Sequence, residues 1–260
     1  MTKIKHFFKN EILDYKLLLR NIPSSTILIF TLSVVCANLM ANKELFSYKY
    51  FALDWGFAYS WIMFLCMDII CKRFGAKAAI KISILSLMAN LLVCASFFLT
   101  TSFGGNWGEY YNLLNTTNDA TTQQIANTIN KSLDKTIGGS WYVVIGSATA
   151  FLTSSIINAL LNKNIGNLVE SKLKKDNFFT FAVRSYISTF IAQFVDNFLF
   201  ATIVSRVFFD WTWTQIIICS FFGAFCELLC EILFSGYGYN VLKKWQKHNI
   251  GEEYLTSNKE

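Results

Sequence analysis

The chain has 260 residues, of which 53% are hydrophobic and 15% are charged, and its formal net charge is +6. Its mean hydropathy is +0.38. A soluble domain of this length could not cover so much apolar surface with so few charges. The basic residues fall in short clusters between apolar runs, which argues against a nucleic-acid-binding protein. The composition therefore indicates an integral membrane protein.

Six apolar runs are long enough, or nearly so, to cross the roughly 30 Å hydrocarbon core of a bilayer. In chain order they span residues 24–41, 56–71, 82–101, 140–161, 178–204 and 213–241. The last run is long enough to tilt or break, and Gly236 and Gly238 mark the expected break. The sequence predicts an all-α bundle of about six transmembrane helices.

Lysine and arginine are distributed unevenly among the connections. Five precede the first run and four lie in each of residues 72–81, residues 162–176 and the tail, whereas the other three connections carry two, two and one. Short basic segments stay on the cytoplasmic side, so we expect both termini in the cytoplasm. The expected parts are a cytoplasmic or interfacial basic arm (1–23), a transmembrane domain (24–241) and a cytoplasmic tail (242–260).

The longest connection, residues 102–139, is rich in Asn, Thr and Gly and is expected to face outward. It either folds over an entrance or is disordered, and the sequence leaves both readings open.

The seven cysteines all lie in or beside apolar runs, and the two histidines, His6 and His248, lie near the chain ends. An odd number of cysteines in membrane helices indicates reduced thiols rather than a disulfide framework. Four good zinc ligands cannot be assembled from these residues. We expect no metal and no cofactor.

The fifth run carries a polar stripe made by Ser185, Thr189, Gln193 and Asp196. Their spacings of 4, 4 and 3 place all four within an arc of about 80° on a helix. Hydroxyl and amide side chains often join membrane helices through hydrogen bonds, whereas an acid in mid-span needs a functional reason. The stripe therefore predicts either helix packing or a ligand-binding face.

Other polar residues extend this set. Ser188 and Asn197 flank the stripe, and Arg184 lies near its cytoplasmic end, where it could snorkel or pair with a carboxylate. Asn38 lies in the first run, where an amide is more often a helix-packing group than a ligand contact. Asp68 precedes a basic turn, so it either pairs with Lys72 or lies within the membrane as a functional acid.

Glu227 and Glu231 in the last run are four residues apart and share one helix face. Two ionised carboxylates there would repel in a low dielectric, so one should be protonated or paired. The alternatives are a proton-carrying or cation-binding role, or neutralisation by a partner such as Arg184 or Lys163.

Two longer segments carry a family likeness, residues 68–81 and residues 184–200, with a short Leu173-Lys-Lys between them. The second contains Arg-x-x-x-Ser-x-x-x-x-Gln-x-x-Asp, formed by Arg184, Ser188, Gln193 and Asp196. These segments resemble the VUT family of vitamin uptake transporters, whose best-known members import queuosine precursors. The likeness extends over residues 38–239.

The chain departs from that family at charged positions. Family members often carry an acid where this chain has Lys72, and another near Lys163 and Gly166. They commonly have a lysine near the position of Glu227 and a proline near Gly236. These exchanges bear on the identity of the transported molecule.

The resemblance implies uptake of a small planar solute, a 7-deazaguanine such as preQ0, preQ1 or queuine, by alternating access in the plasma (inner) membrane. The implied partners are this solute and membrane lipids, with no nucleic acid, and homo-oligomer formation is left open. The candidate substrate-binding residues are Asn38, Asp68, Arg184, Ser188, Gln193, Asp196, Asn197, Glu227 and Glu231.

Two other functions compete with this one. The substrate-capturing subunit of an energy-coupling vitamin transporter has a similar size and cargo, but needs an ATPase module. An intramembrane enzyme would use paired acids, yet neither an intramembrane histidine nor a serine nucleophile in a glycine-rich turn accompanies them. We therefore do not expect an enzyme.

Overall fold

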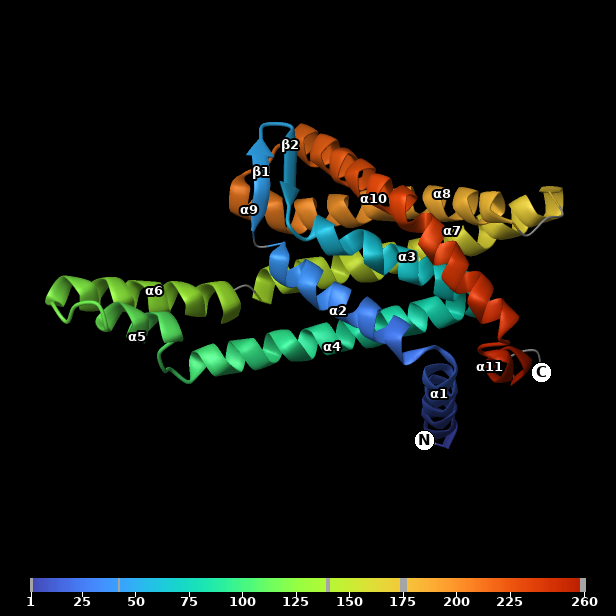
Figure 1. Ribbon diagram of the computed structural model, residues 1–260, viewed down its shortest axis with the longest axis horizontal. Helices are drawn as coiled ribbons and strands as arrows, with labels where there is room; N and C mark the ends of the chain where they lie inside the picture. The colour runs from blue at the N-terminus through green and yellow to red at the C-terminus, as the bar shows by residue number, and fades with distance from the viewer. Residues whose placement is uncertain (1, 42, 139–140, 174–176, 258–260) are drawn as a thin grey trace.

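The computed structural model describes residues 2–41, 43–138, 141–173 and 177–257 (Figure 1). One β-hairpin interrupts an otherwise helical chain. The elements are α1 (Thr2–Asn21), α2 (Ser24–Met40), β1 (Glu44–Tyr48), β2 (Phe51–Asp54), α3 (Phe57–Phe74), α4 (Ala76–Ser102), α5 (Gly108–Leu114), α6 (Ala120–Gly138), α7 (Trp141–Leu173), α8 (Phe178–Phe200), the π-helical turn η1 (Ala201–Ser205), α9 (Arg206–Phe209), α10 (Trp213–Lys247) and α11 (Glu252–Ser257).

The helices confirm the all-α membrane bundle. Four of them, α4, α7, α8 and α10, are long and apolar enough to cross a membrane, and a fifth span results if α1 and α2, which meet at 107°, act together. The predicted count of about six also includes α3, whose 18 residues contain Asp68, Lys72 and Arg73. These charges make α3 too polar to qualify by composition, although it lies inside the bundle.

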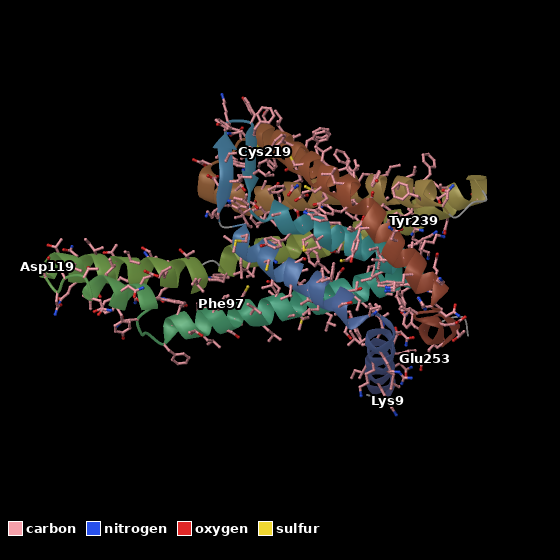
Figure 2. All side chains as sticks on the ribbon, viewed as in Figure 1. Lys9, Phe97, Asp119, Cys219, Tyr239 and Glu253 are labelled. Carbon is pink, nitrogen blue, oxygen red and sulfur yellow. The ribbon has the colours of Figure 1, made fainter. Side chains whose placement is uncertain are left out.

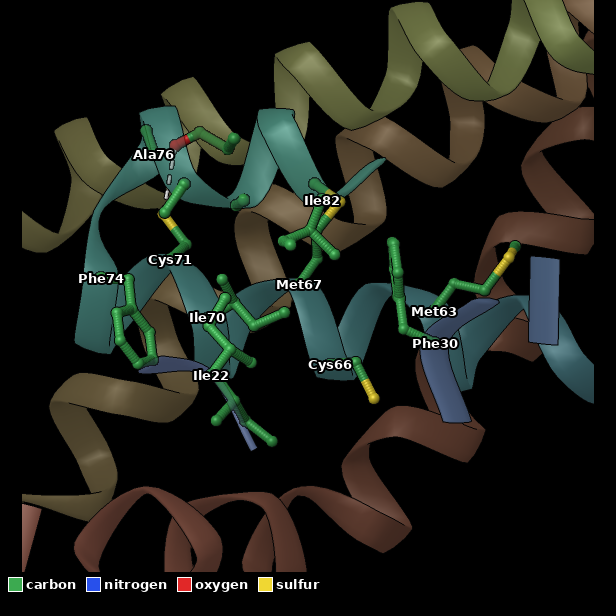
Figure 3. Close-up of a cluster of buried hydrophobic side chains, with 14 of the residues drawn as sticks. Ile22, Phe30, Met63, Cys66, Met67, Ile70, Cys71, Phe74, Ala76 and Ile82 are labelled. Carbon is green, nitrogen blue, oxygen red and sulfur yellow. Dashed lines mark hydrogen bonds between the residues drawn. The ribbon is translucent and has the colours of Figure 1, made fainter. Parts of the chain in front are cut away.

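Helix α3 forms the centre of the bundle. Every residue from Met63 to Cys71 is buried, against α2, α4, α7 and α10. Figure 3 shows its Met63, Met67 and Cys71 among apolar side chains from neighbouring helices. A helix that is apolar around its whole circumference is buried on all sides. The acid in this helix, Asp68, therefore lies at the middle of the protein.

The predicted break in the last run is wrong, because α10 continues through both Gly236 and Gly238. A Cβ added at Gly238 would lie 2.8 Å from Leu65 Cδ1 and 3.3 Å from Ile69 Cδ1 in α3. Gly238 therefore permits close helix packing, whereas Gly236 faces open space.

Both ends of the chain lie at the same end of the bundle, beside the α3–α4 turn (Figure 1). Arg20 of α1 pairs with Glu253 of α11 at 3.0 Å. Arg73 Nε donates to the carbonyl oxygen of Ile250 at 2.8 Å. Lys81 of α4 binds carboxylates of α1, including that of Asp14 at 2.5 Å. An even number of crossings would place the termini together, and the membrane side that they face stays a prediction.

The long connection of residues 102–139 is helical rather than disordered. Helices α5 and α6 pack together as an arm that extends from the bundle, with Asp119 at its tip (Figure 2). Asn130 Oδ1 accepts the backbone N–H of Trp107 at 2.7 Å, and the Trp107 indole donates to Asp134 at 2.8 Å. These bonds fix the two helices against each other.

Candidate functional site

A cavity of about 510 Å³ lies among α2, α3, α7, α8 and α10, below the β1–β2 hairpin. Its polar lining includes four carboxylic acids, two amides and five hydroxyl groups, from Glu44, Asp54, Asp196, Glu227, Asn38, Asn197, Ser60, Thr136, Ser147, Ser205 and Ser220. Its aromatic lining includes Phe57, Phe151, Phe200 and Trp211. Apolar walls with a few convergent polar groups are typical of a small-molecule site.

The hairpin positions Asp54 at this cavity. The backbone N–H of Gly56 donates to Asp54 Oδ1 at 2.7 Å. A side chain at Gly56 would meet the Ala37 carbonyl oxygen at 2.9 Å, so only glycine allows the hairpin to enter α3 this close to α2. On the other face of the hairpin, the Phe51 ring lies edge-on to Phe222 of α10, with 5.2 Å between centroids. The hairpin is thus fixed to two helices.

Burial raises the pKa of Asp54 from its ordinary value of 3.8 to about 7. A raised carboxyl pKa favours the folded state fully below pH 4, and this stabilisation is lost as the pH rises through about 7. At about 1.4 kcal/mol per pKa unit, the loss is on the order of a few kcal/mol. Asp54→Asn should remove this pH dependence, because an amide does not ionise in this range. The amide oxygen can still accept the hydrogen bond from the Gly56 N–H. Melting temperatures between pH 4 and 8 should fall more steeply for the wild type, and parallel curves would contradict the assignment.

Glu227 contributes the most enclosed acid of the cavity, with 4% of its surface exposed. Ser60 Oγ of α3 donates to Glu227 Oε1 at 2.5 Å, and Asn197 Nδ2 of α8 lies 3.5 Å from Oε2. On the neighbouring wall, Ser154 of α7 donates to Asp196 at 2.7 Å. Gly223, one turn before Glu227, provides room for Asn197, whose Nδ2 would lie 2.9 Å from an added Cβ.

A second polar group lies deeper in the bundle. We call it the Asp68 cluster, and its members are Asp68, Asn158, Ser185, Thr189 and Glu231, each with no exposed surface. Asn158 Nδ2 donates to Asp68 at 2.8 Å and Thr189 Oγ1 donates at 3.1 Å. The Ser185 hydroxyl contacts both carboxyl groups, Asp68 and Glu231. The cluster joins α3, α7, α8 and α10 at one level.

A third group lies toward the α3–α4 turn. Arg184 is 5% exposed, and its Nε donates to Asn162 Oδ1 at 2.8 Å. Asn162 Nδ2 in turn donates to Ser188 at 3.3 Å. Gly166 leaves space for the guanidinium, because a Cβ there would lie 2.8 Å from Arg184 Cζ. Burial rules out the snorkelling alternative for Arg184.

The nine candidate residues therefore divide among three levels. Four of them line the cavity: Asn38, Asp196, Asn197 and Glu227. Two belong to the Asp68 cluster, Asp68 and Glu231, and two belong to the third group, Arg184 and Ser188. The last one, Gln193, is fully buried on the stripe, and neither of its amide atoms has a hydrogen-bond partner within the part of the chain that the structure describes.

These contacts decide two alternatives that the sequence left open. Asp68 does not pair with Lys72, since its partners are hydroxyl and amide groups. Glu227 and Glu231 share a helix face but belong to different sites, with Ser60 and Ser185 as their respective contacts. Neither glutamate forms an ion pair with Arg184 or another basic group of the described residues.

Sequence reasoning missed the polar face of α7. Ser147, Ser154, Asn158 and Asn162 are spaced by 7, 4 and 4, so the helical arithmetic that found the α8 stripe finds this one too. Ser147 contacts Asn38 and Ser154 contacts Asp196. Asp54 had no such signal, because it lies in a hairpin that the sequence did not predict.

In the described residues, no group of three or more His, Cys, Asp or Glu side chains could hold a metal ion. The described fold is that of a multi-pass membrane protein with a solute-sized cavity among its helices.

The chain belongs to the family described as putative vitamin uptake transporter, whose model matches residues 54–241. No curated protein and no solved structure matches the chain. The matched range contains the cavity acids Asp54, Asp196 and Glu227 and the whole Asp68 cluster, whereas Asn38 and Glu44 lie outside it. Membership in a transporter family points away from catalysis.

Proposed function

We propose that this protein imports a small planar solute, a 7-deazaguanine of the queuosine-precursor class, across the plasma (inner) membrane. The observation that carries the proposal is the cavity of about 510 Å³, lined by four acids, two amides and aromatic rings, in a chain of the vitamin uptake family. A cavity of this size suits a bicyclic base with a small substituent.

The polar lining matches the hydrogen-bonding edge of a guanine-like base. Such an edge presents adjacent N–H donors, which one carboxylate accepts in paired fashion, and Asp196 or Glu227 is placed to do this. The amides of Asn38 and Asn197 supply donors for the carbonyl group of the base. A ring such as Phe151 offers a stacking face for the planar solute.

The charge of the cavity lining narrows the choice of transported solute. Four acids line it, Glu44, Asp54, Asp196 and Glu227, against the single lysine Lys135 from the α6 end. Solutes rich in N–H donors, or carrying an amine as preQ1 and queuine do, suit this surface better than anionic vitamins. We therefore expect the amine-bearing deazaguanines to bind more tightly than preQ0.

Alternating access requires the site to open to the other end of the bundle. Between the cavity and the α3–α4 turn lie the Asp68 cluster and the Arg184–Asn162 pair, both buried. Transport would therefore break these contacts. Asn158 of α7 is bonded to Asp68 of α3, and Ser185 of α8 is bonded to Glu231 of α10.

The first test is the thermal stability of the purified protein in detergent with preQ0, preQ1, queuine and guanine. A ligand that binds only the folded state raises the melting temperature by mass action. We expect a shift with at least one deazaguanine in the wild type and its loss in Asp196→Asn. The matched control is Asp119→Asn, which makes the same change at the tip of the α5–α6 arm and should keep the shift. No shift with any deazaguanine would overturn this choice of solute.

Reconstitution distinguishes a stand-alone carrier from the substrate-capturing subunit of an energy-coupling transporter. Uptake of the bound deazaguanine into liposomes that contain this chain alone supports the carrier. Binding without uptake, together with co-purification of an ATPase module from the native membrane, would favour the subunit.

A further inference from the structure

The Asp68 cluster brings two carboxyl groups from different helices to one hydroxyl. Ser185 Oγ contacts Asp68 Oδ2, and it lies 2.5 Å from Glu231 Oε1. A serine hydroxyl carries one proton, so it donates to only one of the two carboxyl groups. The other carboxyl group must supply the proton for its own contact with Ser185.

The remaining contacts decide which carboxyl group that is. Asp68 also accepts from Asn158 and Thr189, so with Ser185 it has three donors, as an ionised carboxylate requires. Glu231 contacts Ser185 and has Thr189 and Asp68 as further hydrogen-bonding neighbours, and among the described residues its Oε2 is buried without a partner. An anionic oxygen there would be uncompensated, whereas the carbonyl oxygen of a neutral acid is far less costly to bury. Glu231 is therefore the protonated member.

While α3, α8 and α10 are packed as in this structure, their surroundings exclude ionisation of both carboxyl groups. Neither acid takes part in an ion pair among the described residues. Two carboxylates linked through one hydroxyl repel strongly at low dielectric. The pair therefore holds one proton, with both carboxyl groups in direct hydrogen-bond contact with the Ser185 hydroxyl.

The other charged or titratable groups near the pair are few. The Arg184 guanidinium of α8 interacts electrostatically with the Asp68 carboxyl group. The Cys71 thiol of α3 also lies close enough to Asp68 for an electrostatic interaction. Lys163 of α7 acts on Cys71, and the α7 group that contacts Asp68 directly is the neutral amide of Asn158. On α10, Glu227 lies one turn from Glu231 and lines the cavity.

We propose that Glu231, Ser185 and Asp68 form a one-proton relay that couples proton movement to solute transport. Glu231 passes its proton to Ser185 Oγ while the Ser185 proton passes to Asp68, so that Glu231 becomes the anion and Asp68 the neutral acid. No other bond changes. The coupling rests on the proposed transport function, whereas the shared proton does not.

Because the relay joins three helices, a change in its protonation affects how these helices pack. Asp68, Ser185 and Glu231 belong to α3, α8 and α10, and each of these helices also contributes residues to the wall of the cavity. Loss of the proton leaves two adjacent anions, which drives these helices apart. Glu227, four residues from Glu231 and at the cavity wall, offers a route by which the proton arrives. Proton release would thus be linked to opening of the bundle.

Infrared difference spectroscopy of the purified protein tests the shared proton without any solute. The carbonyl stretch of a protonated carboxylic acid should be present in the wild type and lose one component in Glu231→Gln. In Ser185→Ala that component should persist at a shifted frequency, because its hydrogen-bond acceptor is removed. Glu227→Gln serves as the matched control on the same helix, and it should leave the Glu231 component in place.

The proposal is overturned if Glu231→Gln leaves the protonated-acid spectrum unchanged, or if Ser185→Ala does not shift it. It is also overturned if sodium chloride, compared with choline chloride, raises the melting temperature and Glu231→Gln abolishes that rise, because the site would then bind Na⁺. If Glu231→Gln does not fold, the frequency shift in Ser185→Ala still tests the pair. In liposomes, solute-driven proton entry should be lost in Asp68→Asn while solute binding remains. Failure of every solute to bind would leave the infrared result standing.

Discussion

Gly223→Leu should reduce solute binding by about 100-fold or more while leaving the protein folded. Gly223 lines the cavity, and an added Cβ would lie 2.9 Å from Asn197 Nδ2. The new side chain would both occupy the cavity and displace this amide. Steric overlap and a lost hydrogen bond each cost roughly 1–3 kcal/mol, and about 1.4 kcal/mol corresponds to tenfold in affinity. Titration of the solute identified by thermal shift gives the two dissociation constants.

Gly236→Leu is the matched control for this experiment. It adds the same atoms to the same helix, but a Cβ at Gly236 meets nothing within 4 Å. Binding should stay within a factor of two or so, since the change is remote from the cavity and isolated surface substitutions have small effects. Equal binding by Gly223→Leu and the wild type would show that the solute does not use this cavity.

Gly238→Leu should destabilise the fold by roughly 1–3 kcal/mol, whereas Gly236→Leu, only two residues away, should not. Gly238 is buried against Leu65 and Ile69 of α3, so a larger side chain forces α10 away from the central helix. Gly236 is exposed, and replacing glycine within a helix gains up to about 1 kcal/mol of helix propensity.

Thermal unfolding in detergent, monitored by the helical circular dichroism signal, measures this difference. The order of melting temperatures should be Gly236→Leu at or above the wild type, and Gly238→Leu several degrees below it. If both substitutions stabilised the protein equally, α10 would not be packed on α3 through Gly238, and a flexible hinge at these glycines would return as the explanation.

The polar residues of α8 serve three levels of the bundle rather than one site. Along one face, Asp196 reaches the cavity and Ser185 and Thr189 reach the Asp68 cluster, whereas Arg184, turned about 100° from Ser185, reaches Asn162. A helix advances about 1.5 Å per residue, so groups twelve residues apart are separated by roughly 18 Å along the axis. A stripe of this length can combine solute binding, a proton site and a closed gate.

The sequence by itself determined the class of fold and most of its helices. Long apolar runs have one stable solution in a bilayer, because every backbone polar group must be satisfied within the segment. The predicted runs 178–204 and 213–241 accordingly correspond to α8 with η1 and to α10. The inward face of α8 was also predictable, since Ser185, Thr189 and Gln193 follow helical spacing and are all fully buried.

Tertiary structure alone decided which polar groups meet. Helical spacing fixes the face on which Glu227 and Glu231 lie, but their partners, Ser60 and Ser185, come from other helices. It also decided that Gly238 serves close packing and that a hairpin brings Asp54 to the cavity. The physical reason is that sequence periodicity shows only which residues share a face of one helix. Hydrogen bonds between helices depend on how the helix axes pack against one another, and no single segment encodes that packing.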